Sequence, residues 1–447
     1  MNSSLPPWLE FFTFSSENAR LVLFGCVLLG LTSGVIGCFA FLRKRSLMGD
    51  ALAHAALPGV CAAFLLTGTK DPIVILIGAV VACWLAALSI DLIVRHTRCK
   101  EDSALGMVLS VYFGVGVLML TYIQRSGNAA QSGLNRYLFG QAAAMLKRDV
   151  WTFGVLSVLL VGVVVLAYKE FKVVSFDPQY ARTAGVPTRF IETAMATLIV
   201  LAVAIGLQAV GVVLMAAMLV TPAAAARYWT HRLSTMLVLA GGFGALSGAI
   251  GAYVSYLGPR MPTGPWMVVS ITSLFLISLF FAPRRGVFAR ILQMRSTRTR
   301  TSMENVLRTL YVLGEKEQRV DAARTLADLL KHRPMSLHAM DKTLSMLIEQ
   351  GLAEESLQGR YSLTDAGIER AARLTRIHRL WELYLTRKLE LAPDHVHDDA
   401  DEIEHIITPE LEERLIAALD NPDADPHASH IPVPAGMGAG AASRISK

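Results

Sequence analysis

The chain has 447 residues, of which 53% are hydrophobic and 17% charged, and its mean hydropathy is +0.45. Soluble globular proteins of this size are much less apolar, so these totals exclude that class and predict an integral membrane protein. The formal net charge of +6 is unevenly spread, because charged residues become frequent only after about Arg284. We therefore expect a soluble domain to follow a membrane domain.

Apolar runs of about 18–25 residues, long enough to span a bilayer, predict about nine membrane helices. Lysines and arginines gather in alternate loops, and by the positive-inside rule this places the N-terminus outside and the C-terminal region in the cytoplasm. The sequence thus predicts an all-α polytopic protein of the cell membrane, with a transmembrane domain over residues 1–287. The runs lie near residues 20–42, 48–67, 72–94, 104–123, 150–168, 190–207, 208–227, 235–257 and 265–283.

Two ionisable residues, Asp50 and His54, lie inside the second apolar run. An ionisable side chain near the bilayer centre costs about 2.5–3.5 kcal/mol on insertion scales, so it usually faces a partner, a cavity or a permeating ion. Residues four apart share one face of a helix, so the carboxylate and the imidazole can converge. Such a pair suits manganese, zinc or ferrous iron. A buried Asp–His hydrogen bond that joins two helices explains the spacing equally well.

The segment Arg45–Val60, with the sequence RSLMGDALAHAALPGV, resembles the signature of the membrane permeases of manganese/zinc/iron ABC transporters. The resemblance implies that Asp50 and His54 are metal ligands on a translocation path. It also implies a second permease subunit in a homo- or heterodimer, separate ABC ATPase subunits, and an extracytoplasmic metal-binding protein that delivers the ion. The chain has no Gly-x-x-x-x-Gly-Lys-Ser/Thr loop of its own, so we expect a permease rather than an enzyme.

A short helix is predicted after Asp177, which is suited to an N-cap. Pro178 fits the first helical position, and Gly185 can end the helix. A surface connector accounts for this pattern by itself. In the resembled permeases, however, Asp-Pro-x-x-Ala-x-x-x-Gly-Val is the coupling helix that docks into the ATP-hydrolysing subunit. The matching residues are Asp177, Pro178, Ala181, Gly185 and Val186.

Residues 288–301 are basic and rich in Ser and Thr, which predicts a juxtamembrane linker near anionic lipid headgroups. Helical periodicity then occurs in Ser302–Gly314, Val320–Leu330 and Ser336–Glu349, and Gly351–Thr364 alternates like a hairpin. Three helices and a hairpin predict a winged-helix α+β domain over residues 302–370. Together with the segment Leu363–Gly367, this domain resembles the DNA-binding half of iron/manganese-dependent repressors.

Histidines and carboxylates gather at helical spacing in the region 371–434, which is predicted to be helical. A solvated charged face would explain any single pair, but six such groups in two clusters favour a metal-binding role. The resemblance to the repressors implies that these groups bind manganese, iron or zinc in two neighbouring sites of a dimerisation region. The six residues are His378, Glu382, His397, Asp401, Glu404 and His405.

Two positions depart from the repressor pattern. Asp401 stands where these repressors tend to have Cys or Glu, and Asn305 stands where the first helix usually supplies Met or Asp. Asn305 can offer only a carbonyl oxygen, which makes it the weakest candidate ligand. Beyond this region, residues 435–447 are rich in Gly and Ala and are predicted to be disordered.

The predicted recognition helix Met335–Leu344 carries little positive charge, and the hairpin adds chiefly Arg360. Contacts to nucleic-acid phosphates would be weak, so DNA binding is disfavoured and a metal-responsive regulatory domain is favoured. The leading hypothesis is the transmembrane subunit of an ATP-driven divalent-metal importer that works by alternating access. The alternative is a membrane-anchored metal sensor that regulates transcription. An ion-driven secondary transporter is disfavoured by the resemblance to the coupling helix and by the scarcity of other acids in the predicted spans, to which Asp91 is the main exception.

Overall fold

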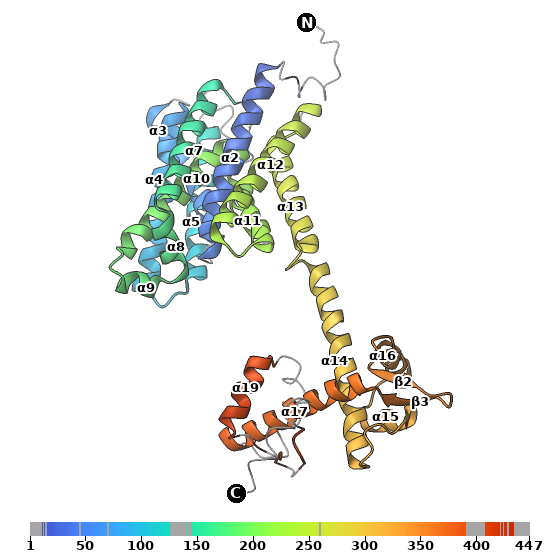
Figure 1. The fold of residues 1–447 in the computed structure, drawn as a ribbon. Coiled ribbons are helices and arrows are strands. Elements are labelled where there is room, and N and C mark those ends of the chain that lie inside the picture. The colour runs from blue at the N-terminus through green and yellow to red at the C-terminus, as the bar shows by residue number, and fades with distance from the viewer. Residues whose placement is uncertain are drawn as a thin grey trace. The chain divides into compact units, whose positions relative to one another are not determined.

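The computed structural model describes residues 11, 13, 16–43, 46–68, 71–125, 140, 145–258, 261–389, 407–420, 422, 424–426 and 429–432. The chain divides into two compact units between Arg290 and Ile291. The described part of the first unit is helical, and the second unit combines helices with a small sheet (Figure 1).

Nine helices in the described part of the chain are long and apolar enough to cross a membrane, which confirms the predicted all-α polytopic fold. Two short helices, α8 (Tyr168–Phe176) and α9 (Pro178–Thr183), lie between the fifth and sixth of these. The nine are α2 (Glu17–Leu42), α3 (Ser46–Thr67), α4 (Pro72–His96), α5 (Glu101–Arg125), α7 (Lys147–Leu166), α10 (Thr188–Val210), α11 (Val212–Trp229), α12 (Leu233–Leu257) and α13 (Thr263–Phe281).

The outer surface of this helical unit is apolar. Leu66, Leu118 and Val238 are strongly exposed although their side chains are hydrophobic. A helix that is apolar on every side is stable in lipid, where its backbone polar groups are satisfied within the helix. The exposure of these side chains therefore agrees with a bilayer environment.

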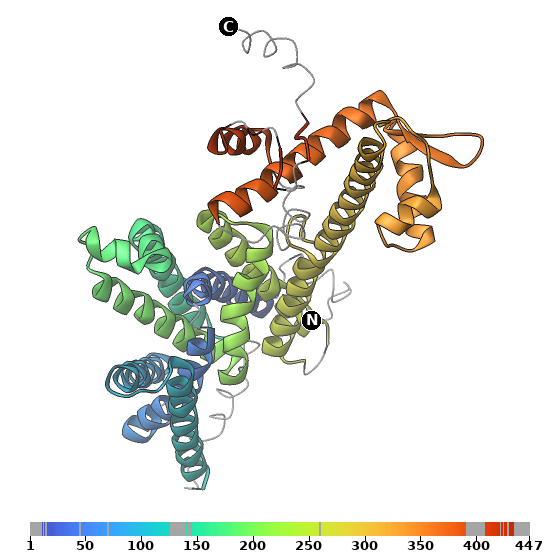
Figure 2. The ribbon, with the colours of Figure 1, turned by 90° about the horizontal axis from the view of Figure 1, so that it is seen from below.

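Helix α2 packs against α12, α11, α7 and α10. At its contact with α12 the two backbones approach closely. A Cβ atom added to Gly30 would overlap with the carbonyl oxygen of Gly244, and a Cβ atom added to Gly244 would overlap with the carbonyl oxygen of Gly30. Small residues that permit such close approach are a common means of packing membrane helices. Helices α3, α4 and α5 form a group at one side of the bundle, coloured blue to teal in Figure 2, and α3 also contacts α11.

The second unit contains the predicted helices and hairpin. Strands β2 and β3 form the antiparallel hairpin, and β1 pairs with the other edge of β3. A core that includes Val306, Leu344 and Tyr361 joins the helices to this sheet. The elements are α14 (Val287–Lys316), β1 (Arg324–Thr325), α15 (Leu326–His332), α16 (Leu337–Glu349), β2 (Ala353–Glu355), β3 (Arg360–Leu363), α17 (Asp365–Lys388) and α19 (Pro409–Ala418).

The prediction of a helix over Val320–Leu330 was wrong in its first half. Arg324 pairs with Tyr361, and Thr325 pairs with Arg360, so this segment forms a third strand. The helix begins only at Leu326, because the Thr325 side chain accepts a hydrogen bond from the Asp328 amide and Asp328 caps Thr325 in return. The local capping box therefore sets the start of the helix.

The basic segment 288–301 lies within α14, one continuous helix that ends at Lys316. The same helix supplies Val306, Leu307 and Leu310 to the core of the second unit. The segment predicted as a linker is therefore helical. Helix α17 is also continuous across residue 370, where the winged-helix domain was predicted to end.

Candidate metal sites

Asp50 and His54 lie one turn apart on the same face of α3, as the sequence predicts. The Nε2 atom of His54 is 3.4 Å from Oδ1 of Asp50. The side chain of His54 is 16% exposed and that of Asp50 is 34% exposed. A carboxylate and an imidazole therefore converge within a predicted membrane helix, and the carboxylate opens to the surface of the single chain.

Two neighbouring helices hold this pair in place. The ring of His54 packs edge-on against Phe113 of α5, with the ring centroids 4.7 Å apart. Gly49 lies directly against Leu219 of α11, since a Cβ atom at Gly49 would be 2.6 Å from the Leu219 side chain. Helix α3 therefore packs closely against α11 at the residue that precedes Asp50. The contribution of Phe113 was missed because a contact between separate helices leaves no signal in local spacing.

One ring nitrogen of His54 has no hydrogen-bond partner in the described part of the chain. Its Nδ1 atom is buried and makes no hydrogen bond there. A buried polar atom without a partner costs about 1–3 kcal/mol, so such atoms often indicate a ligand or an unseen water. Among the described residues, no group of three or more His, Cys, Asp or Glu side chains could hold a metal ion. The single chain thus offers Asp50 and His54 as two donors.

The segment 177–186 has the predicted capped geometry. Oδ1 of Asp177 accepts a hydrogen bond from the Tyr180 amide at 2.8 Å, and Pro178 is the first residue of α9. Gly185 has a φ of +77°, a conformation that favours glycine. Ala181 is fully buried, and its carbonyl accepts from the Val186 amide. Tyr180 is 61% exposed, so the short helix presents an aromatic side chain at the surface.

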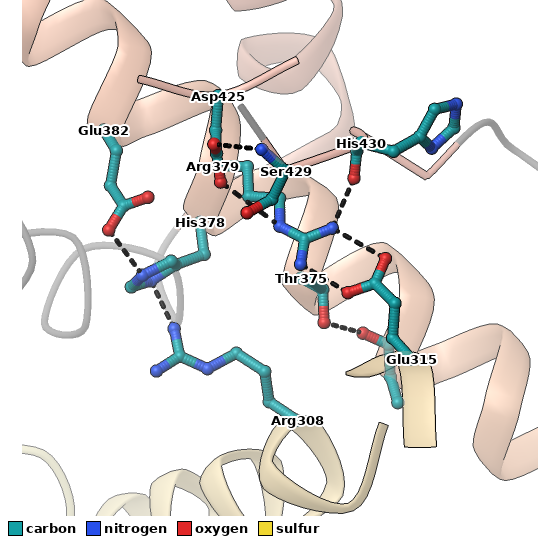
Figure 3. A network of polar contacts seen from close by, with 10 residues as sticks. Arg308, Glu315, Thr375, His378, Arg379, Glu382, Asp425, Ser429 and His430 are labelled. Atoms are coloured by element: carbon teal, nitrogen blue, oxygen red, sulfur yellow. Dashed lines mark hydrogen bonds and ion pairs between the residues drawn. The ribbon is translucent and has the colours of Figure 1, made fainter. Parts of the chain in front are cut away.

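In the second unit, His378 and Glu382 are buried on α17, and Nε2 of His378 lies 3.1 Å from Oε1 of Glu382 (Figure 3). The guanidinium of Arg308 on α14 contacts the other ring nitrogen, Nδ1. Asn305 is also buried, and its Oδ1 atom has no hydrogen-bond partner among the described residues. The predicted ligands His397, Asp401, Glu404 and His405 lie outside the described residues.

The imidazole of His378, the carboxylate of Glu382 and the orphaned carbonyl of Asn305 fit a divalent metal by donor type. Both ring nitrogens of His378 are engaged, so a metal would have to replace one of these contacts. Arg308 was missed in the sequence, although it follows Asn305 by three residues and therefore lies on nearly the same helix face.

A separate network of ion pairs surrounds Arg379, the residue after His378. Its guanidinium donates to both carboxylate oxygens of Glu315, at 3.0 and 2.5 Å, and to the carbonyl oxygen of His430 (Figure 3). Its Nε atom lies 3.5 Å from Asp425. Burial lowers the pKa of Arg379, but the hydrogen bond and charge of Glu315 and the charge of Asp425 outweigh this, so the pKa is raised. The network therefore joins α14, α17 and the segment near Asp425.

The chain is similar to characterised families in both units. Residues 15–282 match the ABC 3 transport family, and residues 364–433 match the metal binding and dimerisation domain of the iron dependent repressor. The manganese transport system membrane protein MntC of Bacillus subtilis is 43% identical over 413 residues, which cover 92% of this chain and 93% of that protein.

Two further comparisons concern the first unit. The zinc transport system membrane protein TroC of Treponema pallidum is 42% identical over 282 residues, covering 63% of this chain and 95% of that protein. The solved structure of PsaBC from Streptococcus pneumoniae in complex with Fab covers 64% of this chain and 99% of its own, with 31% identity and a TM-score of 0.57. The chain therefore belongs to the ABC 3 transport family, as a multi-pass membrane permease subunit that carries a C-terminal domain of the iron-dependent repressor type.

Proposed function

We propose that this permease is the transmembrane subunit of an ATP-driven importer of a divalent metal ion, manganese, zinc or ferrous iron. The observation that carries the proposal is the Asp50–His54 pair, with a separation of 3.4 Å between donor atoms. The carboxylate and imidazole suit these borderline metals as ligands. Relatives named for manganese and zinc transport support the same substrate class.

A second permease subunit would complete the metal site. Each chain supplies two donors, whereas zinc usually takes four ligands and manganese more. Asp50 is one-third exposed although it lies in a helix apolar enough to span a membrane. Because a carboxylate facing lipid is costly, a partner subunit or an aqueous path should cover it. Two copies, or one copy with a related subunit, would thus place four donors around a shared path for alternating access.

Separate ATPase subunits would drive this path through the segment Asp177–Val186. The exposed Tyr180 on the capped helix α9 gives such a subunit a defined surface to contact. An extracytoplasmic metal-binding protein would deliver the ion on the opposite side of the membrane. The excess of basic residues in alternate loops supports this orientation, with α9 and the second unit in the cytoplasm.

The second unit would act as a regulatory metal-binding domain of the transporter. His378 and Glu382 would bind metal together with His397, Asp401, Glu404 and His405 in two neighbouring sites, and Asn305 would be an additional oxygen donor. Bound there, the metal would be coordinated by residues of α17 and, through Asn305, of α14. The charge of Arg308 on α14, whose guanidinium contacts His378 on α17, would oppose this binding.

The test is uptake of manganese and zinc into vesicles that contain the permease with its ATPase subunits and delivery protein. We expect uptake that requires ATP and stops when the ATPase carries an inactivating substitution. ATP-independent uptake would favour a secondary transporter. Absence of uptake, together with metal-dependent binding of operator DNA by the full chain, would establish the membrane-anchored sensor instead.

A further inference from the structure

An ion pair links the end of α2 to the beginning of α10. The Nη2 atom of Arg43 lies 2.7 Å from Oε1 of Glu192. The two side chains are 15% and 29% exposed, so the pair is largely shielded from water. A shielded pair resists separation more strongly than a surface pair, because each charge would otherwise lose its partner in a medium of low dielectric constant.

The position of the pair connects two sites that are distant in the sequence. Arg43 is the C-cap of α2 and stands three residues before α3, whose second turn carries Asp50. Glu192 lies in the second turn of α10, shortly after Gly185 and Val186. Only Pro187 separates Val186 from α10, and the Thr188 amide donates a hydrogen bond to the Val186 carbonyl, so a displacement of the segment 177–186 would reach Glu192 through the first turn of α10. The ion pair can pass that displacement to the start of α3.

The packing around the pair leaves room for movement on one side. Glu192 and Met48 border a cavity of about 150 Å³, which Trp84, Asp91 and Arg189 also line. Arg43, Met48 and Glu192 also border a much smaller space, of about 10 Å³, with Phe39 and Met195. Met48 lines both spaces and precedes Asp50 by two residues. A movement of Glu192 would therefore change the packing around Met48 and displace the turn of α3 that carries Asp50.

From this geometry we infer that Arg43 and Glu192 are positioning residues that couple the segment Asp177–Val186 to the Asp50–His54 pair. They do not bind the metal themselves. Their ion pair transmits the movement of α10 to α3, so that ATP hydrolysis changes the access of the metal site. This inference rests on the proposed roles of the coupling segment and of Asp50 and His54.

The test is a charge exchange in the permease assembled with its ATPase subunits and delivery protein in vesicles. The single variants Arg43→Glu and Glu192→Arg place like charges together, and the double variant restores an ion pair with reversed polarity. Metal uptake, ATP hydrolysis and metal binding are measured on each. We expect the single variants to hydrolyse ATP and bind metal within about threefold of wild type, while uptake per ATP falls at least about tenfold. The double variant should recover uptake to within about threefold.

Lys147→Glu provides the control, because the Glu17–Lys147 ion pair also joins two helices but is more than half exposed. It should leave uptake per ATP unchanged. Unchanged uptake in the single variants would overturn the inference, as would a parallel loss of assembly and ATP hydrolysis that the double variant does not repair. Failure of the proposed function has a different signature: wild type would show no ATP-dependent uptake, or Asp50→Ala would retain it.

Discussion

Arg308 of α14 contacts the Nδ1 atom of His378 on α17, although the two residues are 70 positions apart. The contact brings a permanent positive charge to a predicted metal ligand. A metal ion that binds His378 would meet repulsion from the guanidinium. We therefore expect the charge of Arg308 to lower the affinity of the proposed metal site in the second unit.

The first prediction follows from this contact. Arg308→Ala should tighten manganese binding to the second unit by about tenfold, which corresponds to about 1.4 kcal/mol, because the substitution removes a like charge beside the ligand His378. Isothermal titration of the full-length chain, in an Asp50→Ala background that removes the transport ligand, measures this affinity. Arg295→Ala changes an exposed arginine of the same helix and should have no effect. Weaker binding in Arg308→Ala would contradict the prediction.

The second prediction concerns the close packing of α2 against α12. Gly244→Val places a side chain against the carbonyl oxygen of Gly30, which is backbone and cannot rotate away. Overpacking costs about 1–3 kcal/mol, so the midpoint of thermal unfolding in detergent should fall by roughly 2–12 °C. Gly242→Ala on the same helix meets no atom within 4 Å and should leave the midpoint unchanged. Equal midpoints for the two variants would show that the helices do not approach as described.

The third prediction concerns the cap of α9. Asp177→Ala removes the acceptor for the Tyr180 amide, at a cost of about 1 kcal/mol to the helix. The short helix should fray, and the affinity of the permease for its ATPase subunits should fall by about fivefold in a pull-down titration. Asp177→Asn keeps an acceptor at this position and should bind like wild type. If both variants bind equally well, the segment is a connector and not a docking helix.

The fourth prediction concerns the ion pairs of Glu412 on α19 with α17, of which the pair with Arg376 is buried and the pair with Arg373 is half exposed on the arginine side. Oε1 of Glu412 accepts a hydrogen bond from Arg376 at 2.5 Å, and Arg373 lies 3.1 Å from Oε2. Glu412→Gln would deprive the buried Arg376 of its charged partner, and breaking a buried pair costs about 3–5 kcal/mol. Hydrogen exchange of the α19 amides in the full chain should accelerate at least about a hundredfold. Glu413→Gln, at an exposed position, should not change the exchange; a similar rate in both variants would argue against the pairing.

Local patterns in the sequence predicted much of the fold. The nine candidate spans in the described part of the chain follow from apolar length, the shared face of Asp50 and His54 follows from a spacing of four, and the cap of α9 follows from Asp177 and Pro178. Each of these features depends on residues within one helix or its ends. The capping box at Thr325 was also present in the sequence, but helical periodicity upstream obscured it.

Features that join distant segments were not predictable in this way. Strand β1 exists because Arg324 and Thr325 pair with β3, and the contact of Arg308 with His378 depends on how α14 crosses α17. The same holds for Phe113 beside His54. A single sequence has no periodic signal for such pairings, because they arise only when separate elements pack together.

The central claim is that Asp50 and His54 bind the transported metal. The most direct measurement is ATP-dependent uptake of manganese and zinc by the assembled transporter, with wild type compared with Asp50→Ala and His54→Ala. We predict that each variant loses at least about 90% of uptake while its assembly with the ATPase subunits and its basal ATP hydrolysis remain, because two donors per chain leave no spare ligand. Uptake at the wild-type rate in both variants would contradict the account and make the pair a structural contact within α3.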